Sequence, residues 1–184
     1  MAVEHPHNHD ATFKHCPVCG GPLGPGRALP DLADAARHPT CQTCGFVFFQ
    51  NPKVATSVIV SLDGGILLLK RGITPAYGKW TFPGGFVDRG ERVADAAVRE
   101  TKEECNLDVR LTALLNVYSY QGMPTVIIVY KGEVVGGTLE ARDEMLEARV
   151  FPREAIPWDD LAFPSTVESL RDFFGAERRG RGRR

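Results

Sequence analysis

The sequence has no hydrophobic run that approaches the roughly 18 residues of a membrane-spanning helix. Its first ten residues, MAVEHPHNHD, lack both the basic start and the apolar stretch of a signal peptide. No internal repeat and no helix-turn-helix pattern is evident along the chain. These absences predict a cytoplasmic protein that has no membrane partner and is not built from repeats.

Net charge is nearly absent as well, at −1 for the whole chain. The balance is uneven, because the last eight residues, ERRGRGRR, carry +4 and leave −5 on the preceding body. Gly and Arg bury little apolar area, so residues 176–184 are expected to form a disordered Arg-rich tail, either solvated or in weak contact with nucleic acid. Residues 1–12 are expected to be a flexible start, whose His5, His7 and His9 bind metal weakly or have no function.

A chain of 184 residues with 43% hydrophobic content can form one domain of ordinary size and a small appendage. The appendage is assigned to residues 13–50, which contain all four paired cysteines. The larger domain is assigned to residues 51–175, where the apolar pattern of strands and helices is concentrated. The chain is therefore expected to have two folded parts.

The paired cysteines have the spacing of a zinc site. Cys16 and Cys19 form one C-x-x-C pair, Cys41 and Cys44 form the other, and 21 residues separate the inner members. Four thiolates suit a tetrahedral zinc ion and leave no open position for substrate, so a structural zinc ribbon with four cysteine ligands is predicted. Disulfides or a redox-active C-x-x-C are the alternatives, which a cytosolic setting and the duplicated pair disfavour.

The apolar pattern between residues 51 and 175 predicts an α+β fold. Residues 54–62 and 66–71 read as a hairpin closed at Asp63-Gly64-Gly65. Residues 165–168, Ser-Thr-Val-Glu, have the spacing of a capping box and are expected to open a helix near the end of the chain. The remaining expected elements are a helix at about 91–105 and strands near 109–119, 125–135 and 147–151.

Three carboxylates share one face of the expected helix at 91–105. At about 100° per residue, Glu103 and Glu104 fall on either side of Glu100 within an arc of about 100°. Such a cluster at the negative end of a helix dipole is repulsive, and Mg²⁺ or Mn²⁺ would offset it by coordinating carboxylate and phosphate oxygens together. The alternative is an exposed acidic face paired with Lys102 and Arg99.

The segment from Gly85 to Leu107, GFVDRGERVADAAVRETKEECNL, closely resembles the Nudix box, G-x5-E-x7-R-E-U-x-E-E-x-G-U, where U is aliphatic. The preceding WTFPG resembles the lead-in usual for that family. Two positions depart from the pattern: Thr101 stands at an aliphatic position, and Asn106 replaces the glycine after the helix. Asn tolerates the left-handed conformation best after Gly, so the backbone role is expected to persist.

This resemblance implies a Nudix α/β/α sandwich around a mixed sheet and metal-dependent hydrolysis of a pyrophosphate bond. It implies that Glu100 and Glu104 bind the metal, with Glu103 assisting and the carbonyl of Gly84 as a further ligand. Glu91 and Arg99 are then expected to form a structural ion pair that braces the loop.

Family members commonly supply one more carboxylate from a loop past the box, and residues 142–151 resemble that segment. Glu144 is the first choice for this metal ligand, and Glu147 is the alternative. A surface ion pair with Arg149 or Arg153 is an equally open interpretation for Glu147. The catalytic residues are expected among Glu100, Glu103 and Glu144, with Glu103 and Glu144 standing together as candidates for the general base.

A zinc ribbon joined to a Nudix domain through FFQNPK resembles two groups. NADH pyrophosphatases, which also remove NAD caps from RNA, carry S-Q-P-W-P-F-P-x-S after the box, where this chain reads LNVYSYQGMP at 115–124. The chain instead resembles plant FAD and ADP-ribose pyrophosphatases in three segments, which read NPK, KR-x-I-x-P-x-x-G-x-W and, at 161–163, LAF. A dinucleotide such as FAD or ADP-ribose is therefore the expected substrate, with NADH or NAD-capped RNA as the alternative.

Arg71 is a candidate for contact with a substrate phosphate. The resemblance further implies a homodimer, with the ribbon as a candidate interface. Two functions of other classes stay open, a nucleic-acid-binding module and a nucleotide-sensing regulator on a Nudix fold. Four aromatic side chains are candidates for stacking on the base or flavin ring, with core packing an equally open interpretation for each: Tyr77, Phe82, Tyr118 and Tyr120.

Overall fold

A computed structural model describes residues 13–26 and 37–181, with side chains up to residue 175. The expected flexible start, including its three histidines, lies outside the described residues. The chain divides into two compact units, Met1–Pro52 and Lys53–Arg184, two residues past the boundary expected from the sequence. No helix in the described ranges is long and apolar enough to cross a membrane.

The first unit contains a two-stranded antiparallel sheet. Strand β1 (Leu23–Gly24) pairs with β2 (Thr40–Cys41), and the register places Leu23 opposite Cys41. The second strand therefore carries one of the paired cysteines directly. Little other regular structure is present in the described part of this unit, as expected for a ribbon too small to bury a core of its own.

The second unit is built on a seven-stranded mixed sheet. Its main path runs β5-β4-β3-β8-β7, with β6 paired to β3 and β9 paired to β4. Strands β3 and β8 are parallel, whereas the other pairs are antiparallel. The strands are β3 (Lys53–Leu62), β4 (Gly65–Arg71), β5 (Trp80–Thr81), β6 (Gly84–Phe86), β7 (Leu107–Ser119), β8 (Thr125–Gly137) and β9 (Met145–Phe151).

The hairpin between β3 and β4 forms where the turn residues predict it. Asp63 has φ 49° and Gly64 has φ 79°, and positive φ at both central residues is the requirement of the tight hairpin turn. The two strands then alternate across the sheet. Ile59 and Leu68 face one hydrophobic cluster, while Val58 and Leu67 face the other. Because both faces of β4 are buried, the run ILLLKR begins with consecutive apolar residues and does not alternate between apolar and polar ones.

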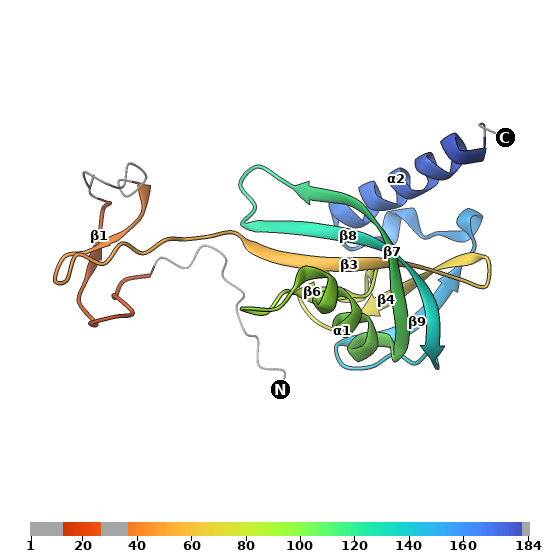
Figure 1. Ribbon diagram of the computed structural model, residues 1–184, viewed down its shortest axis with the longest axis horizontal. Coiled ribbons are helices and arrows are strands. Elements are labelled where there is room, and N and C mark those ends of the chain that lie inside the picture. Colours follow the sequence, from red (N-terminus) through yellow and green to blue (C-terminus); the bar gives the residue numbers. More distant parts are fainter. Residues whose placement is uncertain (1–12, 27–36, 182–184) are drawn as a thin grey trace. The chain divides into compact units, whose positions relative to one another are not determined.

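One helix covers each face of the sheet (Figure 1). Helix α1 (Val93–Cys105) contributes Ala97 and Cys105 to one cluster, and helix α2 (Pro164–Arg181) contributes Leu170 and Phe173 to the other. The expected α/β/α sandwich is therefore confirmed. Two short 3₁₀ turns, η2 (Arg153–Ala155) and η3 (Trp158–Asp160), lead from β9 to α2.

The helix ends show where local sequence signals succeed and fail. Asn106 has φ 58° after α1 and its N–H bonds to the carbonyl of Lys102, so it replaces the expected glycine as anticipated. Helix α2 begins at Pro164, one residue before the predicted capping box, because the carbonyl of Phe163 accepts the first helical hydrogen bonds. Proline at the first helical position needs no N–H partner.

The prediction of a disordered tail from residue 176 was wrong for its first part. Helix α2 continues through Arg181, so the backbone of residues 176–181 is helical. Arg has a high helix propensity, so an Arg-rich segment can extend a helix that packing has already stabilised. Residues 182–184 lie outside the described part of the chain.

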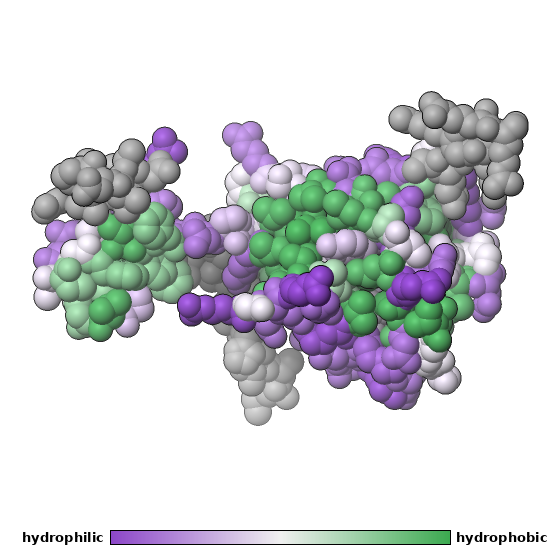
Figure 2. Space-filling view, in the orientation of Figure 1, coloured by the Kyte–Doolittle hydropathy of each residue, from purple (hydrophilic) through white to green (hydrophobic). Residues whose placement is uncertain are grey.

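The polarity of the surface of the second unit differs from one secondary-structure element to another. In Figure 2 the region of α1 is predominantly hydrophilic, whereas hydrophobic residues gather over β7 and β8. Leu114 and Val117 of β7 are among the exposed apolar side chains. The polar surface thus coincides with the helix that carries the acidic cluster.

Candidate active site

The backbone at the start of β6 lies directly against α1 and β3. A Cβ atom on Gly85 would come within 2.5 Å of the Glu100 carboxylate, and one on Gly84 would come within 2.2 Å of the Thr56 carbonyl oxygen. Neither position has room for a side chain. The two glycines of the motif therefore permit the close approach of strand and helix that brings backbone groups to the acidic face.

Glu104 is the most deeply buried carboxylate of this face, with 7% of its surface exposed. Its Oε2 accepts a 2.8 Å hydrogen bond from the N–H of Gly84. Burial raises the pKa of Glu104 to about 8, although the Gly84 N–H lowers it, and the charges of Glu100 and Glu144 add to the increase. The anionic form of Glu104 is thus insufficiently compensated by the protein groups around it.

Arg99 gathers the other acidic side chains of the motif. It binds Glu91 with two hydrogen bonds of 2.8 and 2.9 Å, Glu100 at 2.8 Å and Glu103 at 2.9 Å. The hydrogen bonds from Arg99 lower the pKa of Glu91 to about 2. Burial nevertheless raises the pKa of Glu100 against the effect of Arg99. The bidentate geometry with Glu91 is that of a bracing ion pair.

Arg71, at the end of β4, lies near the buried carboxylate. Burial lowers its pKa, while the charges of Glu104 and Glu144 raise it. The Arg71 Nε donates a 2.9 Å hydrogen bond to the carbonyl of Pro75, and its guanidinium lies 5.1 Å from the ring centre of Phe163. These contacts hold the cation in place from two sides.

The two acidic candidates beyond the motif differ in their surroundings. Glu144 is exposed, its charge influences both Arg71 and Glu104, and its carbonyl accepts a 2.7 Å hydrogen bond from Gly72. Glu147 instead forms an ion pair with Arg149 on β9. Glu144 therefore stays the candidate for the loop carboxylate, and Glu147 has the surface ion pair that was its alternative interpretation.

The aromatic candidates separate into buried and exposed residues. Phe82 and Tyr118 belong to the core between the sheet and α2, and the Tyr118 hydroxyl donates a 2.8 Å hydrogen bond to Asp172. Tyr120 packs against the same core. Tyr120 is half-buried, and Tyr77, with 63% of its surface exposed, is the most exposed of the four. For Phe82 and Tyr118, the structure favours core packing, which was the equally open interpretation.

The contact between Arg71 and Phe163 was not foreseen, since the two residues are far apart in sequence. The same is true of Asp172, which accepts hydrogen bonds from Asn116 at 3.0 Å as well as from Tyr118. A motif or a period along one element carries no signal for such pairs. They depend on how β4, β7 and α2 pack in three dimensions.

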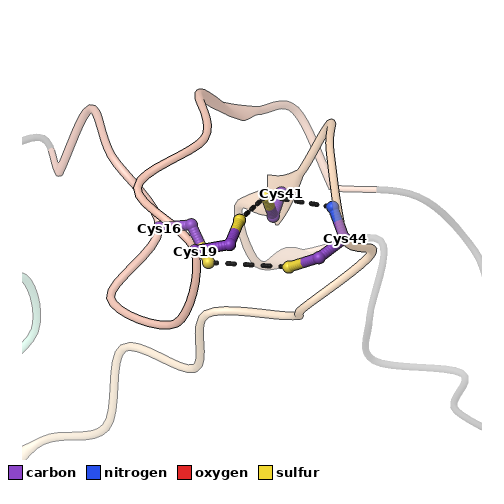
Figure 3. Close-up of side chains that lie close together, drawn as sticks. All are labelled: Cys16, Cys19, Cys41 and Cys44. Atoms are coloured by element: carbon purple, nitrogen blue, oxygen red, sulfur yellow. Dashed lines mark hydrogen bonds between the residues drawn. The ribbon is translucent and has the colours of Figure 1, made fainter.

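The four paired cysteines converge at one point in the first unit (Figure 3). The sulfur atoms of Cys19 and Cys41 are 3.5 Å apart, and those of Cys16 and Cys44 are 3.8 Å apart. Sulfurs bound tetrahedrally about 2.3 Å from one ion would lie about 3.8 Å from each other. Within the described residues, this quartet is the only set of three or more potential ligands whose atoms all lie within 4.8 Å.

The backbone forms the same tight turn at each of the two C-x-x-C pairs. Gly20 has φ 74° and bonds to the carbonyl of Cys16, and Gly45 has φ 77° and bonds to the carbonyl of Cys41. The N–H of Cys44 lowers the pKa of Cys41 to about 6 against the effect of burial, with a further N–H from Thr43. The Phe46 N–H lowers the pKa of Cys44, but hydrogen bonding with Cys19 and burial raise that pKa to about 12. The convergence of the four sulfur atoms is therefore what allows the quartet to hold a metal ion.

Comparison with known structures identifies the fold class. The chain aligns with the crystal structure of a NUDIX hydrolase from Nitrosomonas europaea at 33% identity and a TM-score of 0.83, which covers 91% of this chain and 94% of that one. The sandwich and the acidic helix are therefore those of a Nudix hydrolase fold.

Residues 51–173 match the NUDIX domain, and the chain belongs to this family. It is 40% identical over 119 residues to an ADP-ribose pyrophosphatase of Methanocaldococcus jannaschii and 27% identical over 171 residues to the NAD-capped RNA hydrolase NudC of Pseudomonas fluorescens. These alignments cover 62% and 91% of this chain, which spans 69% and 58% of the two relatives. The protein is a hydrolase that acts on pyrophosphate bonds.

Replacing Glu91 with Gln is expected to lower the thermal unfolding midpoint at neutral pH, since it removes the bidentate partner of Arg99. The folded pKa of about 2 lies below the ordinary value of 4.5. The stabilisation from Glu91 is therefore complete above pH 4.5 and is lost as the pH falls toward 2. The difference in midpoint between wild type and Glu91→Gln should shrink across this window, as measured by circular dichroism.

The matched control for this measurement is Glu133→Gln, which removes an exposed carboxylate paired with Arg110. An exposed pair of this kind contributes little, so the control should stay close to wild type at every pH. A Glu91→Gln difference that stays constant from neutral to acid pH would contradict the assigned role.

Proposed function

We propose that the protein uses divalent cations bound at α1 to hydrolyse the pyrophosphate of a nucleoside-diphosphate-linked compound. The observation that carries this proposal is the burial of Glu104 beside Glu100, under the backbone of Gly84. A hydrolase needs a cation where phosphate oxygens must be neutralised, and this cluster is a place where protein groups alone leave negative charge uncompensated.

The donor set fits Mg²⁺ or Mn²⁺. Carboxylate oxygens of Glu100, Glu103 and Glu104, with the carbonyl of Gly84, are hard ligands of the kind these ions prefer. A bound cation would also offset the burial cost that raises the pKa of Glu104. When bound, such a metal orients water and lowers its pKa.

The chain's own residues then have separate tasks in the proposed reaction. Glu100 and Glu104 hold the metal, and Arg99 keeps the helix carboxylates in position through its contacts with Glu100 and Glu103. Glu103 or Glu144 accepts the proton from the attacking water, since both carboxylates are less buried than Glu104. Arg71, held by Pro75 and Phe163, contacts a substrate phosphate.

An adenosine-containing dinucleotide such as ADP-ribose or FAD is the proposed substrate. The relative named ADP-ribose pyrophosphatase supports this choice, and the exposed ring of Tyr77 is available for stacking on a base. A second candidate, NADH or NAD-capped RNA, is favoured by the alignment with NudC, which reaches 91% of the chain.

We further propose that the cysteine quartet binds zinc as a structural ion. The soft thiolate donors and their tetrahedral spacing support zinc over Mg²⁺ or Ca²⁺.

Glu104→Gln is expected to reduce kcat for ADP-ribose by at least about 100-fold in Mg²⁺, because it removes a charged metal ligand while keeping the side chain's shape. Turnover is measured as release of AMP, and folding is checked by circular dichroism. Glu147→Gln is the matched control, since Glu147 pairs with Arg149 on the surface of β9. Near-normal activity of Glu104→Gln would refute the proposed metal site.

Substrate preference is measured as kcat/KM on FAD, NADH, ADP-ribose, NAD-capped RNA and oxidised dGTP with Mg²⁺ or Mn²⁺. The proposal predicts that ADP-ribose or FAD exceeds the other substrates by at least about tenfold, equivalent to about 1.4 kcal/mol of transition-state binding. A dominant NADH or NAD-capped RNA activity would instead establish the second candidate. Dominant turnover of oxidised dGTP would exclude both.

Cys41→Ser is expected to reduce the zinc content from about one ion per chain to near zero, measured by mass spectrometry of the acid-digested protein. Cys105→Ser is the matched control, since Cys105 is buried in the core beneath α1 and donates a 3.0 Å hydrogen bond to the carbonyl of Thr101. A serine can keep that bond. Unchanged zinc in Cys41→Ser, or none in the wild type, would contradict the assignment.

A further inference from the structure

A hollow of about 520 Å³ lies beside α2, outside the proposed active site. Three elements form it: η2 supplies Arg153 and Glu154, η3 supplies Trp158, and α2 supplies Arg171 and Phe174. None of these residues belongs to the motif, the acidic cluster or the cysteine quartet. The hollow lies by the helix on the face of the sheet opposite α1.

Two guanidinium groups of the hollow have no acidic partner among the residues that the structure describes. In the described part of the chain, no carboxylate lies within ion-pair distance of Arg153 or Arg171. Both side chains are exposed, and the Arg153 guanidinium lies 4.4 Å from the ring centre of Phe174. The contact with Phe174 holds one cation over an aromatic face without neutralising it.

The acidic groups nearby do not cancel this charge. Glu154 lines the hollow and is the negative side chain that opposes the two arginines. Asp172, next to Arg171 in sequence, accepts hydrogen bonds from Asn116 and Tyr118 instead. The residues that line the hollow therefore carry two positive charges and one negative charge, that of Glu154, while Glu168 lines an adjoining hollow together with Arg171.

Trp158 adds an aromatic surface to this charge. Its side chain is 39% exposed, whereas the other tryptophan, Trp80, is buried at 5%. An exposed indole accepts the flat face of a nucleobase, and guanidinium groups bind phosphate. A ring next to two unpaired arginines matches the alternation of base and phosphate along a nucleic-acid strand.

We infer that Arg153, Trp158 and Arg171 form a binding surface for a single-stranded segment of nucleic acid, separate from the hydrolytic site. The sequence favours a strand over a mononucleotide, because residues 176–184 add five arginines after the last residue of the hollow. This surface requires no hydrolysis, and its binding does not depend on the proposed metal site. Nucleic-acid binding at this surface and hydrolysis at α1 can therefore be refuted independently of each other.

The test is fluorescence anisotropy with a labelled single-stranded RNA oligonucleotide, without added Mg²⁺ or Mn²⁺. Arg153→Ala combined with Arg171→Ala is expected to weaken binding at least about fivefold. The slope of log K against log salt should become shallower by about 1.4, which corresponds to two lost phosphate contacts on a single strand. Glu154→Gln should tighten binding, because it removes the opposing charge.

Tryptophan fluorescence tests the stacking contact. The RNA should quench the emission of the wild type, and Trp158→Phe should abolish most of that quenching while retaining binding, since a phenyl ring still stacks. Trp158→Ala should weaken binding. Quenching that persists in Trp158→Phe would place the strand elsewhere.

The matched control is Arg110→Ala with Arg142→Ala, which removes two exposed arginines that are paired with Glu133 and Glu140. Glu104→Gln should bind RNA like the wild type, which separates this surface from the hydrolytic site. The inference is overturned if the Arg153 and Arg171 variant binds RNA as tightly as the control, or if glutamine at the five arginines of 176–184 alone abolishes binding. It is also overturned if the surface binds phosphatidylserine vesicles but not RNA.

Discussion

The close contact of the Gly84–Gly85 backbone with helix α1 is the constraint on which the proposed active site depends. A side chain at Gly85 would collide with Glu100, and one at Gly84 would collide with the backbone of β3. Because both positions lack a Cβ atom, the N–H of Gly84 reaches Glu104 inside the protein. The motif thus brings a backbone amide and the carboxylates of Glu100 and Glu104 close together.

The electrostatics of α1 follow from this packing. Arg99 is the cation that contacts three carboxylates, and its geometry suits Glu91 best because two parallel hydrogen bonds form there. Glu104 receives no such contact and is also the most buried of the group. The fold therefore disfavours the charged form of Glu104 more than that of its neighbours, and an added cation is the physical means of stabilising that form.

Local signals predicted most of the fold and the motif, while long-range packing supplied the rest. The hairpin turn at Asp63-Gly64 and the end of α1 at Asn106 were predictable, because each depends on the conformation of only a few neighbouring residues. Tyr118 could not be assigned in this way, because its partner Asp172 lies on a helix far along the chain. The tail shows the opposite limit: its Gly and Arg content indicated disorder, whereas the helix propensity of Arg and the continuation of α2 determine the backbone of residues 176–181.

The ligand chemistry of the cysteine quartet and that of the carboxylates on α1 suit different tasks. Four cysteine thiolates at tetrahedral spacing are soft ligands that fill every position around an ion, so a metal there has no place for water or substrate. Carboxylates on a helix are hard ligands that leave positions open, because one helical face cannot surround an ion. Phosphate oxygens are hard ligands too, and they can complete the coordination only at the second kind of site. The proposed hydrolysis therefore belongs to the carboxylates of α1, and a metal in the cysteine quartet would stabilise the first unit without contacting substrate.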